Sequence, residues 1–246
     1  MKKIMFCDRY GLTDAVLRKQ KTMTRRMVVV PKELQEAEHL EIRMSKDKTY
    51  AYICTNFDKT GQWKEPVTRI KMPYAIGEEI AIAQAYKTDE VLTFNAYEHD
   101  GTKRKDGAKR HKEMLKSEGY HNKMYVKADY MPHRIRITDV RIERMNDIPD
   151  DDCRREGIIH VEWKQWLKQD LDDLSPQRYK THDLWTLPKF EEEWLDSWAD
   201  QSPDNITAST PRTCFIVLFA KLAKKQPKDM LKLNPWVYAY EFELIK

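Results

Sequence analysis

Residues 131–158 of the 246-residue chain read MPHRIRITDVRIERMNDIPDDDCRREGI. In the first half, branched apolar residues alternate with polar ones from Ile135 to Val140 and again at Ile142. This is the pattern of a strand with one buried face and one wet, basic face. In the second half, Pro149 precedes a run of three aspartates and Gly157 follows shortly after, which favours a helix over about 149–156. The sequence therefore predicts a long strand followed at once by a short helix.

Further elements are expected on both sides of this segment. Strand-like patterns occupy residues 3–7, 28–30, 40–44, 50–54 and 80–84, with Pro73 and Gly77 marking the turn into the last of them. A short helix is predicted from Thr13 or Asp14 to Arg18. Towards the C-terminus, a helix over about 212–225 precedes WVYAYEFELI, which alternates as a closing strand at 236–245.

Two stretches interrupt this order. Residues 88–122 are dense in charge, glycine and histidine, so we expect a charged loop whose cations could reach a phosphate backbone. Residues 160–209 are rich in tryptophan, and Trp194 and Trp198 lie four positions apart, which indicates a helical insertion. The chain shows no internal repeat and no clear linker, so residues 1–246 are read as a single domain with two insertions.

Composition narrows the class of protein. The chain is 41% hydrophobic and 11% aromatic, enough for a packed core, and its formal net charge of +4 permits a nucleic-acid partner without requiring one. Four widely separated cysteines favour neither a zinc site nor a disulfide framework, so we expect no metal and no cofactor in a reduced, cytoplasmic protein. The longest apolar run, at 214–220, is far shorter than a membrane span, and we expect no membrane partner.

The segment KQKTMTRR, residues 19–26, gathers cations and two hydroxyls without a carboxylate. It lies at the end of the first predicted helix and in the loop that follows. Cations there complement the helix dipole, which is the simplest interpretation. An anion-binding loop or a catalytic corner would need the same composition, so the segment is also a candidate site.

Several of these segments, taken in order, resemble the ASCH family of the PUA-like superfamily. They are the N-terminal helix and loop, GEEIAIAQ at 77–84, the stretch at 131–158 and NPWVYAYEFELI at 234–245. More narrowly, they are similar to the larger ASCH-type proteins of phages and prophages. The resemblance covers about residues 4–30, 72–87, 124–158 and 210–246. It implies an α+β fold, a bent mixed β-barrel with flanking helices, and a cleft for RNA or a modified nucleoside.

The resemblance also implies a set of site residues. Some small members hydrolyse the acetyl amide of N4-acetylcytidine with a Lys and a Thr from a Lys-Thr-x-Thr segment and a Glu at a helix end. The matching positions here are Lys21, Thr24 and Glu156, with Thr22, Arg25 and Arg26 beside them as ligand-binding residues. The Gly-Arg that often precedes the Lys in the family is Lys19-Gln20 in this chain.

The residue types suit such chemistry. A threonine becomes a nucleophile when a neighbouring base takes its proton, and an amine can be that base when burial or nearby cations lower its pKa. In the hydrolase interpretation Thr24 attacks or positions a water, Lys21 is the base, and Glu156 protonates the leaving amine. Arg26 or a backbone N–H then stabilises the oxyanion. Alternatively, Arg25 or Arg26 holds a phosphate.

Three alternatives remain open at this point. Glu156 could instead be the structural partner of a core arginine such as Arg26. The whole protein could be a non-catalytic RNA-binding module, with Arg134, Arg136 and Arg141 meeting phosphates. It could also be a phage accessory protein that docks a protein partner through residues 160–205.

Overall fold

The computed structural model describes residues 1–35, 40–55, 68–166, 179–188 and 206–245. Its largest sheet has five strands in the order β1-β6-β7-β10-β2. These strands are β1 (Lys2–Ile4), β6 (Glu79–Ile82), β7 (Arg134–Arg144), β10 (Trp236–Ile245) and β2 (Met23–Met27). Only the β1–β6 pair is parallel, and the sheet is therefore mixed.

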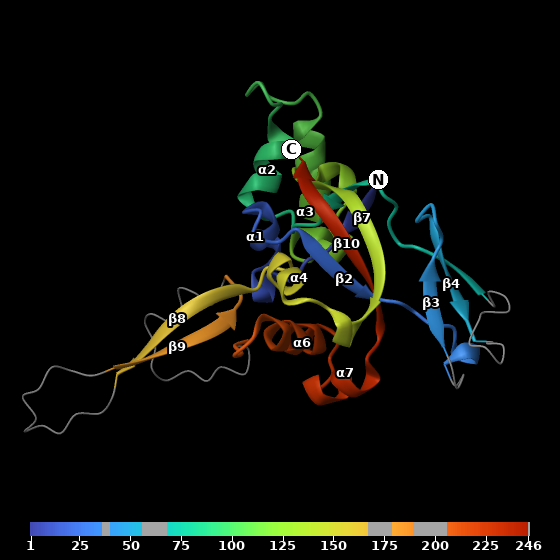
Figure 1. The fold of residues 1–246 in the computed structure, drawn as a ribbon. Helices are drawn as coiled ribbons and strands as arrows, with labels where there is room; N and C mark the ends of the chain where they lie inside the picture. Colours follow the sequence, from blue (N-terminus) through green and yellow to red (C-terminus); the bar gives the residue numbers. More distant parts are fainter. Residues whose placement is uncertain (36–39, 56–67, 167–178, 189–205, 246) are drawn as a thin grey trace, which may run out of the picture.

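The alternating pattern that predicts the longest strand is confirmed. In β7 the side chains of Ile135, Ile137 and Val140 are fully buried, while the intervening positions Arg136 and Thr138 are exposed. β10 pairs along its whole length with β7, with a register shift between Glu241 and Phe242, and the two strands curve together through the molecule (Figure 1). Together they provide the centre of the sheet on which the other elements pack.

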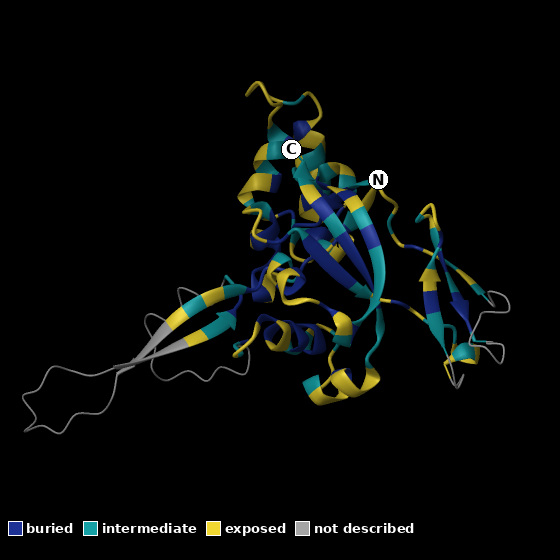
Figure 2. Ribbon diagram, in the orientation of Figure 1, coloured by how far each residue is buried: buried dark blue, intermediate teal, exposed yellow. Residues whose placement is uncertain are grey.

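Unlike β7, β10 is buried on both faces over Val237 to Tyr240, as Figure 2 shows in dark blue. Its apolar side chains join one core with those of β1, β6, β7 and the helix α6 (Pro211–Leu222). That helix begins with Thr210, whose side chain accepts a hydrogen bond from the backbone N–H of Thr213, and with Pro211 in its first turn. The helix α7 (Pro227–Leu233), which the sequence did not predict, connects α6 to β10.

A smaller antiparallel sheet lies to one side of the main sheet (Figure 1). It consists of β3 (Glu41–Met44), β4 (Tyr50–Cys54) and β5 (Thr68–Lys71), with β4 in the centre. Ile42, Ala51 and Ile53 on one of its faces are buried and join the main core. The predicted strands at 40–44 and 50–54 are thus confirmed as neighbours in one sheet.

The charged loop expected at 88–122 is wrong, because this stretch contains the helices α2 (Asp89–Ala96) and α3 (Gly107–Lys116). Each helix buries only a few side chains, chiefly Val91 and Met114, in a second small core that also holds Tyr86. A helix on the surface needs only a few apolar positions. Because the surrounding residues are mostly charged, the sequence pattern did not indicate the two helices.

Residues 160–209 also differ from the helical expectation where they are described. β8 (Ile159–Trp166) and β9 (Tyr179–Thr186) form an antiparallel two-stranded sheet, which extends away from the body of the protein in Figure 1. Trp194 and Trp198, whose spacing suggested the helix, lie outside the described residues.

Two short helices flank the site described below. α1 (Leu12–Leu17) agrees with the predicted helix, and α4 (Asp150–Arg155) agrees with the helix predicted at 149–156. The strand expected at 28–30 is found earlier, at β2, because pairing with β10 selects Met23–Met27. The second half of the KQKTMTRR segment is therefore a strand at the edge of the sheet rather than a loop.

The fold is α+β, and its described strands leave the main sheet open, with β1 and β2 at its two edges. None of the described helices combines the length and the apolar character that crossing a membrane requires.

The importance of the β7 core can be tested by truncation. Ile135 is fully buried between Ile80 and Leu244 on the neighbouring strands, so Ile135→Ala should lower the free energy of unfolding by about 2–5 kcal/mol. Ile76→Ala, at a site that is 44% exposed, is the matched control and should change it by less than about 0.5 kcal/mol. Urea unfolding measures both, and equal midpoints for the two variants would contradict the assignment of this core.

Candidate active site

The loop between α1 and β2 is held by backbone hydrogen bonds to three elements. The N–H groups of Gln20 and Lys21 both donate to the carbonyl of Ala15 at the end of α1, at 2.8 and 3.0 Å. The N–H of Thr22 donates to the carbonyl of Arg155 at 2.9 Å, and its own carbonyl accepts from Phe242 in β10 at 3.0 Å. These bonds bring Lys21 beside the C-terminal end of α4.

A glycine allows the close approach at this end of α4. Gly157 has a φ of +95°, in the left-handed region that other residues rarely adopt. A Cβ atom there would also lie 3.4 Å from the Cβ of Lys21. The chain can therefore turn sharply after Glu156, and this turn lies directly beside the Lys21 side chain.

A cavity of about 240 Å³ opens beside the edge strand β2. Its walls come from the end of β1, α1, β2, α4 and α6. They consist of Met5, Phe6, Cys7, Leu12, Lys21, Thr24, Arg25, Arg26, Glu156, Phe215, Leu218, Phe219 and Leu222. The structure thus places Lys21, Thr24 and Glu156 around one cavity, together with Arg25 and Arg26.

Lys21 and Glu156 form a buried ion pair. Lys21 is 2% exposed and Glu156 is 3% exposed. The ammonium of Lys21 donates to Glu156 Oε2 and, at 2.9 Å, to the main-chain carbonyl of the same residue. Burial lowers the pKa of Lys21 below its ordinary value, and although Glu156 opposes this shift, the neighbouring Arg26 and Arg25 add to it. The amine is therefore easier to deprotonate than a surface lysine.

Arg25 is the centre of a larger set of ion pairs. Its guanidinium contacts Glu143 in β7 at 2.7 Å, Asp152 in α4 at 2.8 Å and Glu156 Oε1 at 3.0 Å. Burial acts to lower the pKa of Arg25, but the three carboxylates outweigh it and the pKa lies above its usual value. Arg25 is therefore a fixed positive charge that holds Glu156 in place.

The set of ion pairs is neutral as a whole. Arg141 and Arg155 bring two further cations, which contact Asp152 and share Glu241 in β10. Four cations thus meet four carboxylates, namely Lys21, Arg25, Arg141 and Arg155 with Glu143, Asp152, Glu156 and Glu241. Such compensation is what allows charges to remain buried.

Arg26 stands apart from this set. Its guanidinium donates to the carbonyl of Met5 at 2.9 Å, and among the described residues no carboxylate pairs with it. Neighbouring side chains of a strand point to opposite faces, so Arg25 reaches the carboxylates and Arg26 does not. The expected pair between Arg26 and Glu156 is wrong, since Arg25 takes that place. Of the three cations that line the cavity, Arg26 is thus the one without a carboxylate partner among the described residues, and it favours an anionic or strongly polarised group inside the cavity.

The two threonines of the segment have different surroundings. Thr24 lines the cavity, and within the described ranges no residue hydrogen-bonds to its hydroxyl, which is thus available to a ligand. Thr22, predicted as a ligand-binding residue, lies outside the cavity lining, and its hydroxyl is 3.5 Å from Nε of Arg155. The structure brings together five of the six residues that the sequence proposed.

The apolar wall is the part of the site that sequence reasoning missed. Phe215, Leu218, Phe219 and Leu222 on α6 have the i, i+3, i+4, i+7 spacing of one helix face. That spacing predicts burial, but it cannot distinguish packing against a core from lining a cavity. Phe215 also lies under the Arg25 guanidinium, with a distance of 5.6 Å from its carbon to the ring centre.

Three other kinds of candidate site are less suitable: the arginines of β7, the buried cysteines and a metal centre. Arg134, Arg136 and Arg141, proposed as a basic RNA-binding face, each contact carboxylates on neighbouring elements. Burial raises the pKa of both Cys153 and Cys214 to about 12, so neither is a ready nucleophile. Within the part of the chain that is described, His, Cys, Asp and Glu side chains form no group suited to a metal ion.

Comparison of the chain with protein-family models, with curated proteins and with solved structures finds no match.

The dependence of the site on Arg25 is testable. Arg25→Met should lower the free energy of unfolding by about 3–5 kcal/mol, because it leaves buried carboxylates without their counter-charge. The difference in free energy of unfolding between the variant and the wild type should become smaller as pH falls, since protonation of those carboxylates removes the unpaired charges. Urea unfolding at several pH values measures it. Arg136→Met, which removes an exposed arginine from similar pairs, is the control and should have a much smaller effect.

Proposed function

We propose that this chain is an ASCH-type protein with a PUA-like core that hydrolyses an N4-acylated cytidine, free or within RNA, in the cavity beside β2. The observation that carries the proposal is that Lys21, Thr24 and Glu156 line this one cavity, with the lysine and the glutamate in direct contact. They are the same three residues that the resemblance of short segments implies as the catalytic set.

The fold supports the proposal at the level of its strand arrangement. The resemblance implies a bent, mixed barrel with helices at its side. The main sheet is mixed, its long strands β7 and β10 curve, and α1, α4 and α6 lie beside it (Figure 1). The proposal includes a reducing cytoplasmic location, with which four free cysteine thiols agree.

The size and polarity of the cavity suit a nucleoside. Its volume of about 240 Å³ is below the range of about 300–1,000 Å³ that is usual for drug-sized ligands. The α6 part of the lining includes two phenylalanine rings that could contact a flat base, and the charged residues adjoin it, with the Arg25 guanidinium over the Phe215 ring. An acylated base needs both kinds of contact, because its ring is apolar on both faces and its amide is polar.

The reaction can be followed through the residues of the site. The Thr24 hydroxyl oxygen attacks the acyl carbon and forms a C–O bond while its proton passes to the neutral Lys21 amine. The C–N bond then breaks, and the leaving exocyclic amine receives a proton from Lys21, either directly or through Glu156. Water hydrolyses the resulting threonine ester and releases the carboxylic acid. In a shorter variant, Thr24 positions a water that attacks directly.

Arg26 has the remaining role in this scheme. The negative charge that develops on the acyl oxygen needs a donor that is not already engaged by a carboxylate. Among the cations of the cavity wall, Lys21 and Arg25 are both held by Glu156, whereas Arg26 contacts a backbone carbonyl. Arg26 is therefore the residue we assign to the oxyanion.

A non-catalytic, nucleoside-binding protein is the second candidate. The observation that favours it is that both carboxylate oxygens of Glu156 are engaged, one by Lys21 and one by Arg25. Such a pair can serve structure alone, and only turnover separates the two functions. The third interpretation, a partner docking through 160–205, depends largely on residues outside the described ranges.

Turnover of N4-acetylcytidine by the purified protein is the direct test, with free cytidine followed by chromatography. Lys21→Arg and Glu156→Gln should each lower kcat by roughly 10²–10⁴-fold, since each removes a proton-transfer step. Thr24→Ala should abolish release, and Thr24→Ser should retain part of it because the hydroxyl remains. Thr138→Ala, on the exposed face of β7, is the matched control and should behave as the wild type. Wild-type protein that releases no cytidine would leave nucleoside binding as the better account.

The rate should also depend on pH in a defined direction. Lys21 acts as a base only when it is neutral, so kcat should rise with pH as the amine loses its proton. The lowered pKa of Lys21 places this rise below the ordinary lysine value of about 10.4. A pH–rate profile measures it, and the limb should disappear in Lys21→Arg because arginine stays protonated throughout. A rate that is independent of pH over this range would exclude Lys21 as the base.

A further inference from the structure

The small sheet β3-β4-β5 has two very different faces. Ala51 and Ile53 of β4 point into the core and are fully buried. The alternate residues of the same strand lie on the opposite face, where Tyr50 and Tyr52 are half-buried and Cys54, at the end of the strand, is buried. The register of the sheet determines which side chains accompany these two tyrosines.

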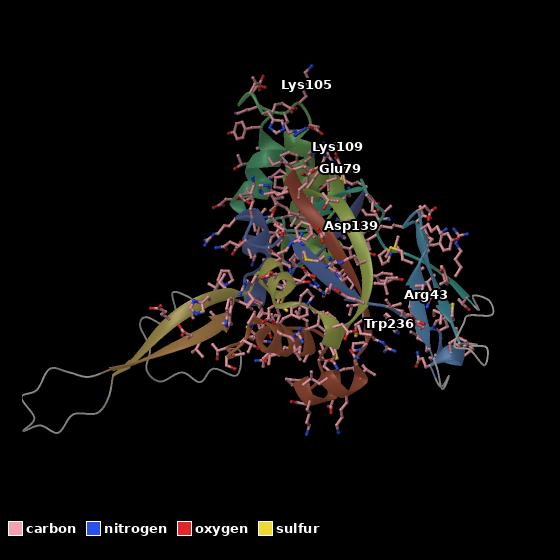
Figure 3. All side chains as sticks on the ribbon, in the orientation of Figure 1. Arg43, Glu79, Lys105, Lys109, Asp139 and Trp236 are labelled. Carbon is pink, nitrogen blue, oxygen red and sulfur yellow. The ribbon has the colours of Figure 1, made fainter. Side chains whose placement is uncertain are left out.

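Cations lie beside both tyrosines. Tyr52 is directly opposite Arg43 in β3 and Arg69 in β5, and Tyr50 is directly opposite Lys71. Residues paired in this way share a face of the sheet. Arg43, Arg69 and Lys71 are all exposed, and Figure 3 shows Arg43 on this outer sheet. We call Arg43, Tyr50, Tyr52, Arg69 and Lys71 the outer face.

The aromatic rings of the outer face are close together and one is already stacked. The ring centres of Tyr50 and Tyr52 are 6.4 Å apart. The Arg69 guanidinium lies over the Tyr50 ring, 3.6 Å from its centre. A flat base can stack on an aromatic ring or on a guanidinium plane, so Tyr52 and the Arg69–Tyr50 pair are two neighbouring stacking surfaces.

The charge of the outer face also selects the partner. Among the described residues, its three cations are accompanied on the same face by one carboxylate, Glu41, which contacts Arg43 at 3.5 Å. The excess of positive charge contrasts with the arginines of β7, which are matched by carboxylates. Rings flanked by excess cations suit a ligand that combines flat bases with phosphates, whereas an acidic peptide would have no use for the rings.

We propose that the outer face binds single-stranded nucleic acid, with two successive bases stacked on Tyr52 and on the Arg69–Tyr50 pair and a phosphate held by Lys71. A duplex is excluded as the ligand because its bases are already stacked on one another. The site is separate from the cavity beside β2, and strand binding here requires none of the cavity residues, so it does not rest on the proposed hydrolysis.

Fluorescence anisotropy with labelled oligouridine and oligothymidine of about 12 nucleotides tests this proposal. Tyr52→Leu and Tyr50→Leu should each weaken binding by roughly tenfold or more, because leucine fills space without offering a π-face. Tyr52→Phe and Tyr50→Phe keep the ring and should bind as the wild type. Tyr125→Leu, which removes an exposed tyrosine elsewhere, is the matched control and should also bind normally.

The contacts between cations of the outer face and phosphates are tested by titrating the salt concentration. Lys71→Ala should reduce the slope of log K against log salt by about one, since it removes one phosphate contact. Lys109→Ala, which removes a cation from α3, near the top of the view in Figure 3 and away from the small sheet, should leave the slope unchanged. Equal affinity for the two oligonucleotides would mean that stacking and phosphates suffice, and tighter RNA binding would add a 2′-hydroxyl contact, so both results support the proposal.

Three outcomes would overturn it. They are no binding by the wild type at low salt, binding that the leucine substitutions leave unchanged, and a duplex that binds as tightly as the single strands. Urea unfolding of the leucine variants shows whether they are folded. If the leucine variants are unfolded, Arg69→Ala replaces them as the test, because it removes a stacking plane from an exposed position. Binding should then weaken in Arg69→Ala and stay at the wild-type level in Tyr50→Phe and Tyr52→Phe.

Discussion

The bond set around the Arg25 guanidinium is the interaction on which the rest of the site depends. One buried cation contacts carboxylates from β7 and α4, so an edge strand, a central strand and a helix are held by the same group. Glu156 is fixed by Arg25 through one oxygen, and only then does its other oxygen face Lys21. The cavity beside β2 therefore owes its charged wall to an arginine whose own role is structural.

The same arrangement explains why structure and catalysis are difficult to separate here. A buried lysine beside a carboxylate is stabilised as an ion pair, yet its burial also makes the neutral amine more accessible. The low dielectric that makes unpaired charges costly is the property that strengthens electrostatic effects on a bound substrate. The site thus combines paired charges with apolar side chains of α6, and the pairing offsets part of the desolvation penalty of the buried charges.

Sequence reasoning succeeded where the local pattern and the final environment agreed. β7 and β10 alternate in sequence and are the central strands, and the acidic start and terminal glycine of α4 identify that helix. Sequence reasoning failed where contacts with distant segments determine the secondary structure. β2 lies at Met23–Met27 because β10 pairs there. The helices α2 and α3 form although their sequence is highly charged. Five of six site residues came together, but the choice of Arg25 over Arg26 depends on which face of β2 meets α4, and no sequence pattern shows that.

The pairing of β2 with β10 has a consequence for the order of assembly. β2 is among the first strands of the chain and β10 is the last, and the Lys21–Glu156 contact alone spans 135 positions. Contacts of such high sequence separation raise the contact order and slow folding. The entropy cost of closing a large loop comes before the stabilising free energy of the contacts that the loop allows. During synthesis the α1–β2 segment must wait for β10 to leave the ribosome. We therefore expect the cavity to form late in folding, after β2 has paired with β10.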